Sequence, residues 1–218
     1  MRVFLIGGSP DAQPPARLAP APGDRVIAAD HGAALARAWG WPLHLLVGDL
    51  DSLSAAETAL VIANGTPVIT APAAKDETDL ELALTQALTE GAREIIICAA
   101  LGGRADHMLA NVLLLARPEL AGLCVTLAAG RESIRLLRGA GSAGAQLELP
   151  GAPGDLLSLL PLGQDASGVT TAGLQYPLHD ETLFLGQARG VSNVFTGSRA
   201  AITLDRGLLL VLHTATSR

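Results

Sequence analysis

The fold is decided by the stretch His44-Leu45-Leu46-Val47-Gly48-Asp49-Leu50-Asp51-Ser52. Its apolar residues, up to Val47, have the length of a buried strand, and Gly48 is typical of the place where a strand ends. Asp49 and Asp51 follow directly, two residues apart. We infer from this pair of carboxylates that the end of the strand holds a cation.

Two other acidic groups follow apolar runs in the same way. Pro67 to Thr70 precedes the group Lys75-Asp76-Glu77-Thr78-Asp79, and Glu94 to Leu101 precedes the group Gly102-Gly103-Arg104-Ala105-Asp106-His107. The carboxyl ends of the strands in a parallel sheet share one edge, where α/β proteins bind ligands. We therefore expect loops from three strands to build one site.

Short apolar runs alternate with segments of helical periodicity up to about residue 130, which predicts βα units and a parallel sheet. The expected strands are Val3–Gly7, Arg25–Ala29, His44–Val47, Pro67–Thr70, Glu94–Ala100 and Leu123–Ala128. The expected helices are Ala33–Trp39, Ala55–Ala63, Asp79–Glu90 and His107–Ala116.

From about residue 131 the helical periodicity disappears, and Gly, Pro, Ser and Asp interrupt short apolar runs roughly every eight to twelve residues, which predicts a β-sandwich or barrel. The expected strands are Ile134–Leu137, Ala145–Leu149, Leu156–Leu160, Gly168–Ala172, Gly190–Phe195, Ala200–Leu204 and Leu208–His213. The expected fold class is α/β, with an N-terminal parallel-sheet α/β domain (residues 1–130) followed by a C-terminal all-β sandwich domain (residues 131–218).

The charge balance excludes some classes of partner. The 218 residues carry 15 Lys or Arg and 21 Asp or Glu, a formal net charge of −6, without a run of basic residues. This argues against binding to nucleic acid or an anionic membrane. No apolar stretch reaches the ~18 residues of a membrane-spanning helix. Cys98 and Cys124 each lie in an apolar segment, so we expect buried thiols and a cytoplasmic protein.

Helix capping is the alternative explanation for each acidic group. Asp51, Ser52 or Ser54 could cap the helix expected from residue 55, and Ser54 with Glu57 has the spacing of a capping box. Asp76 and Asp79 would complement the dipole of the next helix as an acidic pair in its first turn, and Asp106 could cap the helix expected from His107. Capping does not require Asp49, which lies a full turn before the helix, so Asp49 is the carboxylate that indicates function.

Magnesium suits these carboxylates, because it takes oxygen ligands and relies on one or two carboxylates plus substrate phosphates. Zinc fits less well, because the histidines have no ligand spacing. They are His31, His44, His107, His179 and His213. The turn Gly102-Gly103-Arg104 before a helix is a candidate phosphate site, and Gly7-Gly8-Ser9 is a weaker one.

Tyr176 is the only tyrosine of the chain and lies in a turn-like context before Pro177. Its ring is suited to stacking on a flat ligand, but packing against the sandwich edge is the favoured alternative. Ser192 and Asn193 pose the same choice, between turn chemistry and hydrogen bonds to a ligand.

The ordered set of motifs strongly resembles the thiamine pyrophosphokinase (thiamine diphosphokinase) family over almost the whole chain. The motifs are Ala29-Asp30-His31-Gly32, Gly48-Asp49-Leu50-Asp51-Ser52, Lys75-Asp76-Glu77-Thr78-Asp79, Gly102-Gly103-Arg104-Ala105-Asp106-His107, Thr171-Ala172-Gly173-Leu174-Gln175-Tyr176-Pro177-Leu178 and Gly190-Val191-Ser192-Asn193. The resemblance implies a homodimer that transfers pyrophosphate from ATP to the hydroxyl of thiamine and releases AMP, with Mg²⁺ as cofactor.

The resemblance also implies a role for each matching residue. The N-terminal domain would be catalytic and bind ATP and Mg²⁺, and the C-terminal domain would bind thiamine. The catalytic metal ligands would be Asp49, Asp51, Asp76 and Asp79, with Asp30 close to the metal. The nucleotide side would include Asp30, Lys75, Thr78, Gly102, Arg104, Asp106 and His107. Thiamine would lie near Tyr176, Ser192 and Asn193. This sequence departs from the family at Ala74, where the family has an acidic residue, and at His31, where it usually has glycine.

Two other functions remain alternatives from the sequence. One is pyrophosphoryl transfer to another ring-bearing alcohol, such as a pterin. The other is a non-catalytic thiamine or nucleotide sensor, which would have no evident use for four aspartates at one site.

Overall fold

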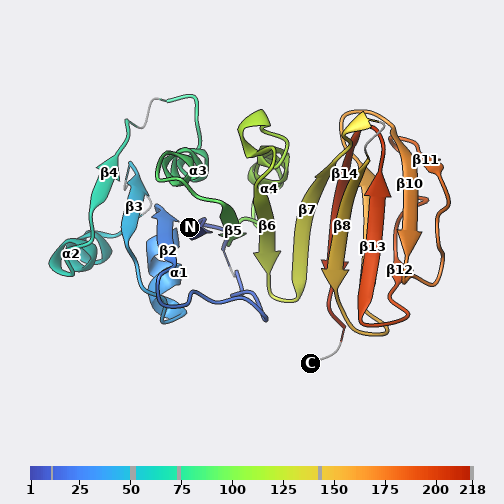
Figure 1. Cartoon of the computed structure of the whole chain (residues 1–218). Coiled ribbons are helices and arrows are strands. Elements are labelled where there is room, and N and C mark those ends of the chain that lie inside the picture. Colours follow the sequence, from blue (N-terminus) through green and yellow to red (C-terminus); the bar gives the residue numbers. More distant parts are fainter. Residues whose placement is uncertain (11, 50–52, 73–74, 142–143, 217–218) are drawn as a thin grey trace. The chain divides into compact units, whose positions relative to one another are not determined.

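The computed structural model describes residues 1–10, 12–49, 53–72, 75–141 and 144–216. The chain forms two compact units, Met1–Gly130 and Arg131–Arg218. The first is an α/β unit with a parallel sheet and the second an antiparallel β-sandwich, as expected from the sequence (Figure 1). In the described part of the chain, no helix is long and apolar enough to span a membrane.

The first unit is built on six parallel strands in the order β6-β5-β1-β2-β3-β4. The strands are β1 (Arg2–Ile6), β2 (Arg25–Ala29), β3 (Leu45–Gly48), β4 (Val68–Thr70), β5 (Glu94–Cys98) and β6 (Cys124–Ala129). The helices are α1 (Gly32–Ala38), α2 (Ala55–Ala63), α3 (Asp79–Thr89) and α4 (Ala105–Leu114), with a 3₁₀ turn, η1, at Pro118–Leu120.

The central strands consist of consecutive apolar residues because both faces of the sheet are covered. In β1, Val3, Phe4, Leu5 and Ile6 are all fully buried. Phe4 and Ile6 belong to one core cluster with residues of α1 and α2. Helix α3 contacts β1, β2 and β3 and buries its apolar residues, Leu80, Ala83, Leu84 and Ala87.

The second unit packs two antiparallel sheets, ordered β12-β9-β14-β7 and β11-β10-β13-β8. The strands are β7 (Glu132–Arg138), β8 (Ala145–Pro150), β9 (Leu156–Pro161), β10 (Ala166–Ala172), β11 (Glu181–Leu183), β12 (Asn193–Val194), β13 (Arg199–Leu204) and β14 (Leu208–Thr214). Leu157 and Leu159 of one sheet share a core with Ile202 and Leu204 of the other and with Phe195.

Three local expectations need correction. The strand expected over Gly190–Phe195 shrinks to β12, because Ser192 has a φ of 61° that interrupts the extended backbone. The last helix of the first unit begins at Ala105, two residues before His107. Cys98 is a buried thiol as expected, and burial raises its pKa to about 12, but Cys124 at the start of β6 is exposed.

Candidate active site

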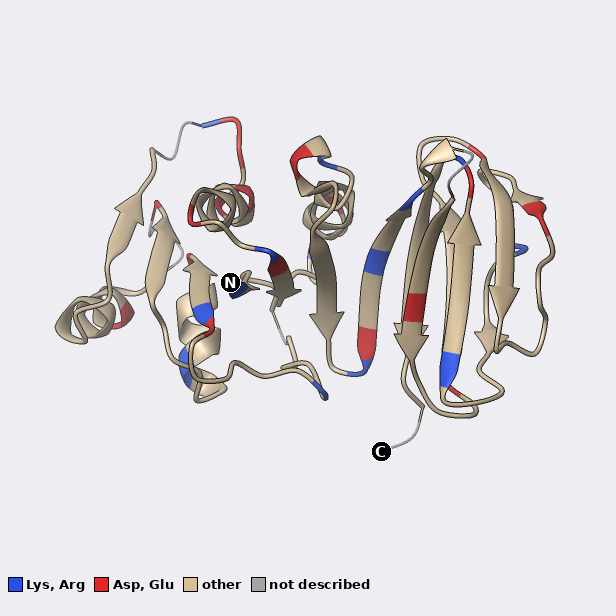
Figure 2. Cartoon of the chain, in the orientation of Figure 1, with Lys and Arg blue, Asp and Glu red and all other residues tan. Residues whose placement is uncertain are grey.

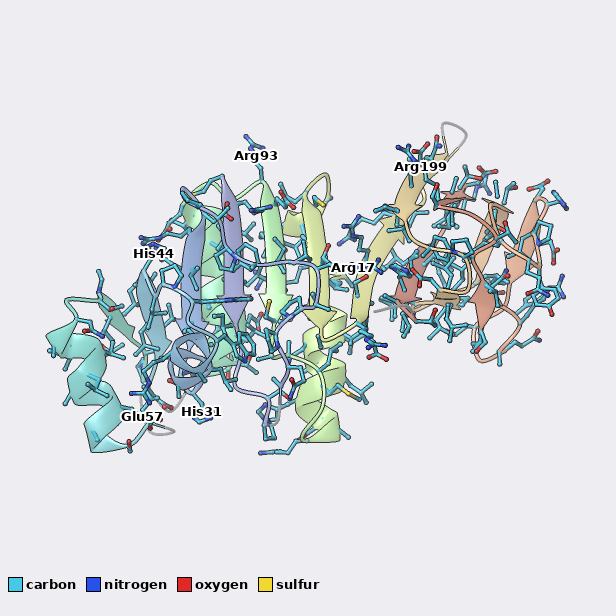
Figure 3. All side chains as sticks on the ribbon, turned by 90° about the horizontal axis from the view of Figure 1, so that it is seen from below. Arg17, His31, His44, Glu57, Arg93 and Arg199 are labelled. Carbon is cyan, nitrogen blue, oxygen red and sulfur yellow. The ribbon has the colours of Figure 1, made fainter. Side chains whose placement is uncertain are left out.

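A cavity of about 450 Å³ lies at the carboxyl ends of the parallel strands. Figure 3 shows His31, which lines it, at this end of the sheet, whereas Arg93 lies at the opposite end, where β5 begins. The loops after β1, β2 and β5 and the first turns of α3 and α4 contribute the walls. The lining residues are Gly7, Gly8, Ser9, Pro10, Ala29, Asp30, His31, Thr78, Asp79, Leu80, Ala99, Gly102, Arg104, His107 and Asn111.

Asp30 is held against β3 by its backbone. Its φ is 43°, a left-handed conformation that aspartate tolerates better than most residues, and its N–H donates to Val47 O at 3.1 Å. The side chain then lies directly over Gly48, whose φ is 153° and whose added Cβ would come within 1.8 Å of Asp30 Oδ1. Only glycine at position 48 leaves room for this carboxylate.

Three carboxylates gather at this end of the sheet. Asp30, Asp49 and Asp79 each offer one oxygen, and these oxygens lie within 4.8 Å of one another, on half-buried side chains. Asp30 follows β2, Asp49 follows β3 and Asp79 is the first residue of α3, so three connections meet here. Hard oxygen donors converging from separate loops fit a divalent cation such as Mg²⁺.

Lys75 supplies a positive charge to this group. Its Nζ donates to Asp79 Oδ1 at 2.5 Å and lies 4.0 Å from Asp49 Oδ2. Burial acts to lower the pKa of Lys75, but the hydrogen bond to Asp79 and the charges of Asp79, Asp49 and Asp30 raise it above its usual value. Figure 2 shows basic and acidic residues next to each other along the loop that enters α3.

The loop after β5 is fixed from two sides. Ser9 Oγ donates to Leu101 O at 2.6 Å, and Asn111 Nδ2 donates to Ala100 O at 2.9 Å. The loop contains two glycines with positive φ, Gly102 at 87° and Gly103 at 71°. These hydrogen bonds hold the glycine turn at the rim of the cavity, beside the start of α4.

Arg104 and Asp106 form an exposed ion pair at the start of α4. Arg104 donates to Asp106 from Nε at 3.2 Å and from Nη2 at 2.7 Å. The hydrogen bond from Arg104 and a further one from the N–H of His107 lower the pKa of Asp106. Because α4 begins at Ala105, Asp106 lies inside the first turn and does not cap the helix.

The structure brings together only part of the expected metal ligands. Asp49 and Asp79 lie in the carboxylate group, together with Asp30, which was expected close to the metal. Asp76 is described but exposed, and it does not belong to this group. Asp51 lies outside the described residues, as does Ala74.

The residues expected on the nucleotide side divide in a similar way. Thr78, Gly102, Arg104 and His107 line the cavity with Asp30, whereas Asp106 and Lys75 are not among the lining residues. Thr78 also has a structural role that the sequence analysis did not assign, because its hydroxyl accepts from the N–H of Glu81 and caps α3.

Ser9, Pro10 and Asn111 line the cavity but were not assigned to the site from the sequence. Gly7-Gly8-Ser9 was a weak phosphate candidate, so a signal for Ser9 existed. Asn111 had none, because an asparagine inside a helical pattern does not reveal its distant carbonyl partner. The capping box of Ser54 and Glu57 is confirmed, which accounts for those two residues without a ligand.

A second cavity, of about 240 Å³, lies in the β-sandwich unit and is lined by Tyr176 and Asn193, among others. The side chain of Asn193 forms two hydrogen bonds with the backbone of Tyr176. Tyr176 N–H donates to Asn193 Oδ1 at 3.0 Å, and Asn193 Nδ2 donates to Tyr176 O at 2.7 Å. Tyr176 is 62% exposed, so its side chain is not buried in the core of the sandwich and is open to a ligand. Ser192 is adjacent, and its N–H donates to Ser158 Oγ at 3.0 Å.

Two family models match consecutive parts of the chain. The catalytic domain of thiamin pyrophosphokinase matches residues 22–127, and the vitamin B1 binding domain of thiamin pyrophosphokinase matches residues 146–209. Thiamine pyrophosphokinase from Bacillus subtilis is 27% identical over 176 residues, 76% of each chain.

Solved structures agree with these matches. The crystal structure of thiamine pyrophosphokinase from Bacillus subtilis superposes with a TM-score of 0.88 at 25% identity, and covers all of both chains. A thiamin pyrophosphokinase family protein from Enterococcus faecalis superposes with a TM-score of 0.84 at 31% identity, again over all of both chains.

Proposed function

Because this chain belongs to the thiamin pyrophosphokinase family, we propose that it transfers pyrophosphate from ATP to the hydroxyl of thiamine in a Mg²⁺-dependent reaction. The enzyme is a thiamine diphosphokinase, a transferase that produces thiamine diphosphate. AMP is the other product when ATP is the donor. The observation that carries this proposal is the carboxylate group of Asp30, Asp49 and Asp79 beside the 450 Å³ cavity.

The three carboxylates would hold the metal at the phosphate end of the nucleotide. Mg²⁺ would neutralise the charge of the transferred group and polarise its oxygens. The described residues fit this ion, since all three donors are carboxylate oxygens that a single cation can reach from separate loops. Asp51 is a further candidate ligand proposed from the sequence, whereas the exposed Asp76 lies outside this group of carboxylates.

The glycine turn and its neighbours would orient ATP. Gly102, Arg104 and His107 lie on the cavity wall at the start of α4, where backbone N–H groups and a guanidinium suit phosphate oxygens. Thr78 also lines the cavity, at the start of α3. Asp106 would act indirectly, by orienting the guanidinium of Arg104.

Tyr176, Ser192 and Asn193 would bind thiamine in the β-sandwich unit. The exposed ring of Tyr176 offers a face for stacking on a heteroaromatic ring. Its backbone is held by Asn193, so the ring is presented from a fixed loop. We also propose a homodimer, from the family resemblance, and a cytoplasmic location, where both free cysteines would stay reduced.

The proposal is tested by product analysis. Protein mixed with ATP, MgCl₂ and thiamine should release AMP and thiamine diphosphate in equal amounts, and omission of MgCl₂ should stop the reaction. A pterin alcohol offered in competition tests the acceptor and should not be consumed while thiamine is present. Folded protein that forms no thiamine diphosphate under these conditions would contradict the proposal.

A further inference from the structure

Lys75 is the only lysine in the sequence, and the other 14 of the 15 Lys and Arg residues are arginines. This single ammonium is placed within the carboxylate group. It lies 2.5 Å from Asp79 Oδ1 and 4.0 Å from Asp49 Oδ2, and the side chain is only 11% exposed. We therefore ask what an ammonium does at this position that a guanidinium would not do.

Charge provides the first part of that reason. Three carboxylates with oxygens within 4.8 Å of one another repel strongly when no cation is between them. An ammonium is a compact point charge on a flexible stem of four carbons, whereas a guanidinium is a planar fork suited to lasting bidentate pairs. Lysine can thus neutralise the group and still move away from it.

Position provides the second part. The cation neutralising Asp49 and Asp79 in this structure is Lys75 Nζ, and the same two carboxylates are proposed ligands of Mg²⁺. The two cations compete for the same oxygens, and they repel each other when both are close. A metal ion bound to Asp49 and Asp79 would therefore push the ammonium of Lys75 away from them.

We propose that Lys75 is a built-in counter-cation, which neutralises Asp49 and Asp79 in the metal-free enzyme and gives up its place when Mg²⁺ enters. The released ammonium is then available to the phosphates of the nucleotide. The inference rests on the proposed function, since that function supplies Mg²⁺ as the competing cation.

The first test uses the unmodified enzyme and the fact that it has one lysine. Protein labelled with ¹³C-lysine gives a single Cε–Hε cross-peak in an NMR spectrum, and this peak reports on Lys75 alone. Addition of MgCl₂ without nucleotide should shift the peak in a saturable manner, and NaCl of equal ionic strength should not. A peak that stays in place while calorimetry shows Mg²⁺ binding would overturn the proposal.

The second test measures metal affinity in variants without nucleotide. Lys75→Met should bind Mn²⁺ about tenfold more tightly than the unmodified enzyme, because one positive charge close to the metal is removed. Lys75→Arg keeps the charge but holds the carboxylates in a more lasting pair, so it should bind Mn²⁺ more weakly than the unmodified enzyme. Arg25→Met, which breaks the ion pair of Arg25 with Glu90 at the start of β2, is the matched control and should leave Mn²⁺ affinity unchanged.

Thermal unfolding gives a readout that does not depend on turnover. Without metal, Lys75→Met should melt at a lower temperature than the unmodified enzyme, because the carboxylates are no longer neutralised. MgCl₂ should raise the melting temperature of the variant by more than that of the unmodified enzyme. An equal or smaller rise would count against a counter-cation role.

The outcomes separate this inference from the proposed function. Metal binding and AMP release with an unmoved Lys75 signal and an unchanged affinity in Lys75→Met would overturn the exchange alone. A signal that moves with metal while no AMP forms would support the exchange and contradict the activity. Failure of the unmodified enzyme to bind divalent cations would overturn both.

Discussion

Gly48 lies where the carboxylate of Asp30 comes closest to the backbone of β3. Gly48→Ala would place a methyl group 1.8 Å from Asp30 Oδ1, in a backbone conformation with a φ of 153°. We expect the variant to fold but to lose turnover by about a hundredfold or more, because Asp30 must leave the carboxylate group. Initial rates of AMP release, with circular dichroism to confirm folding, measure this effect.

Gly40→Ala is the matched control for backbone strain. Gly40 also has a positive φ, of 69°, but a Cβ there would meet no atom within 4 Å. The control should lose about 1 kcal/mol of stability and keep its activity. Equal losses of activity in the two variants would show that strain, and not the displacement of Asp30, explains the effect.

The structure places Asp30 in the carboxylate group and leaves Asp76 outside it, although Asp76 was expected to be a metal ligand. The spacing of Asp76 and Asp79 placed both in one acidic group, but α3 begins at Asp79, so Asp76 stays in the exposed loop before it. Asp30 follows a different strand, and its contact with Gly48 depends on a left-handed backbone that no local pattern announces. The sequence therefore predicted that Asp49 and Asp79 meet at one edge of the sheet, but the contact of Asp30 with Gly48 was seen only in the structure.

The paired variants Asp30→Asn and Asp76→Asn test this difference. Loss of a metal ligand should lower kcat by about a hundredfold in Asp30→Asn, whereas Asp76→Asn should lose less than about tenfold. Steady-state kinetics at several MgCl₂ concentrations measures both. A larger loss in Asp76→Asn would restore the assignment made from the sequence.

At the scale of elements, the loop between β5 and α4 depends on contacts from two other parts of the chain. Ser9→Ala and Asn111→Ala each remove one hydrogen bond to a loop carbonyl, at Leu101 and Ala100. Each bond is worth about 1 kcal/mol, so we expect the KM for ATP to rise about fivefold in each variant with a smaller change in kcat. Initial rates at varied ATP measure this.

Ser9→Thr keeps the hydroxyl and serves as the conservative control, so it should retain most of the affinity for ATP. A double variant at positions 9 and 111 that is no worse than either single variant would indicate that the two bonds hold the loop as a unit. An unchanged KM for ATP in both single variants would remove these residues from the positioning of the nucleotide.

Elements with strong local signals could be predicted from the sequence, and elements that depend on distant contacts could not. The capping box of Ser54 and Glu57 fixes the start of α2 within four residues of chain. By contrast, β12 is shortened by the positive φ of Ser192, whose N–H is held by Ser158 on β9. The short strand β11 was not expected, because its three residues carry too little pattern.

At the scale of the whole molecule, each unit has a core of its own, and the change of sequence texture near residue 131 reflects that division. The parallel unit needs consecutive apolar residues because both faces of its sheet are covered. The sandwich alternates fully buried and less buried residues, as in β9 and β13. Architecture was therefore more predictable than the geometry of either site.

A buried carboxylate contributes to the stability of the sandwich unit, because it forms hydrogen bonds with the segment that follows β14. Asp155 is fully buried, and accepts from Thr216 N–H at 2.9 Å and Ala152 N–H at 3.0 Å, with His213 Nε2 3.0 Å away. Burial acts to raise the pKa of Asp155, but these hydrogen bonds outweigh it, and the pKa is lowered from its usual value.

A carboxyl with a lowered pKa in the folded state stabilises the protein above its unfolded-state pKa, and this contribution is lost as the pH falls through the folded value. We expect stability to fall below about pH 4, the usual range of aspartate, and Asp155→Asn to flatten that dependence.

At neutral pH, Asp155→Asn should cost about 3 kcal/mol, because a buried charged partner of several donors is removed. Asp180→Asn, at an exposed position with a φ of 55°, should change neither quantity. Urea unfolding of the full chain between pH 3 and pH 7 measures both effects, and an equally steep acid loss in Asp155→Asn would assign the acid sensitivity to other carboxylates.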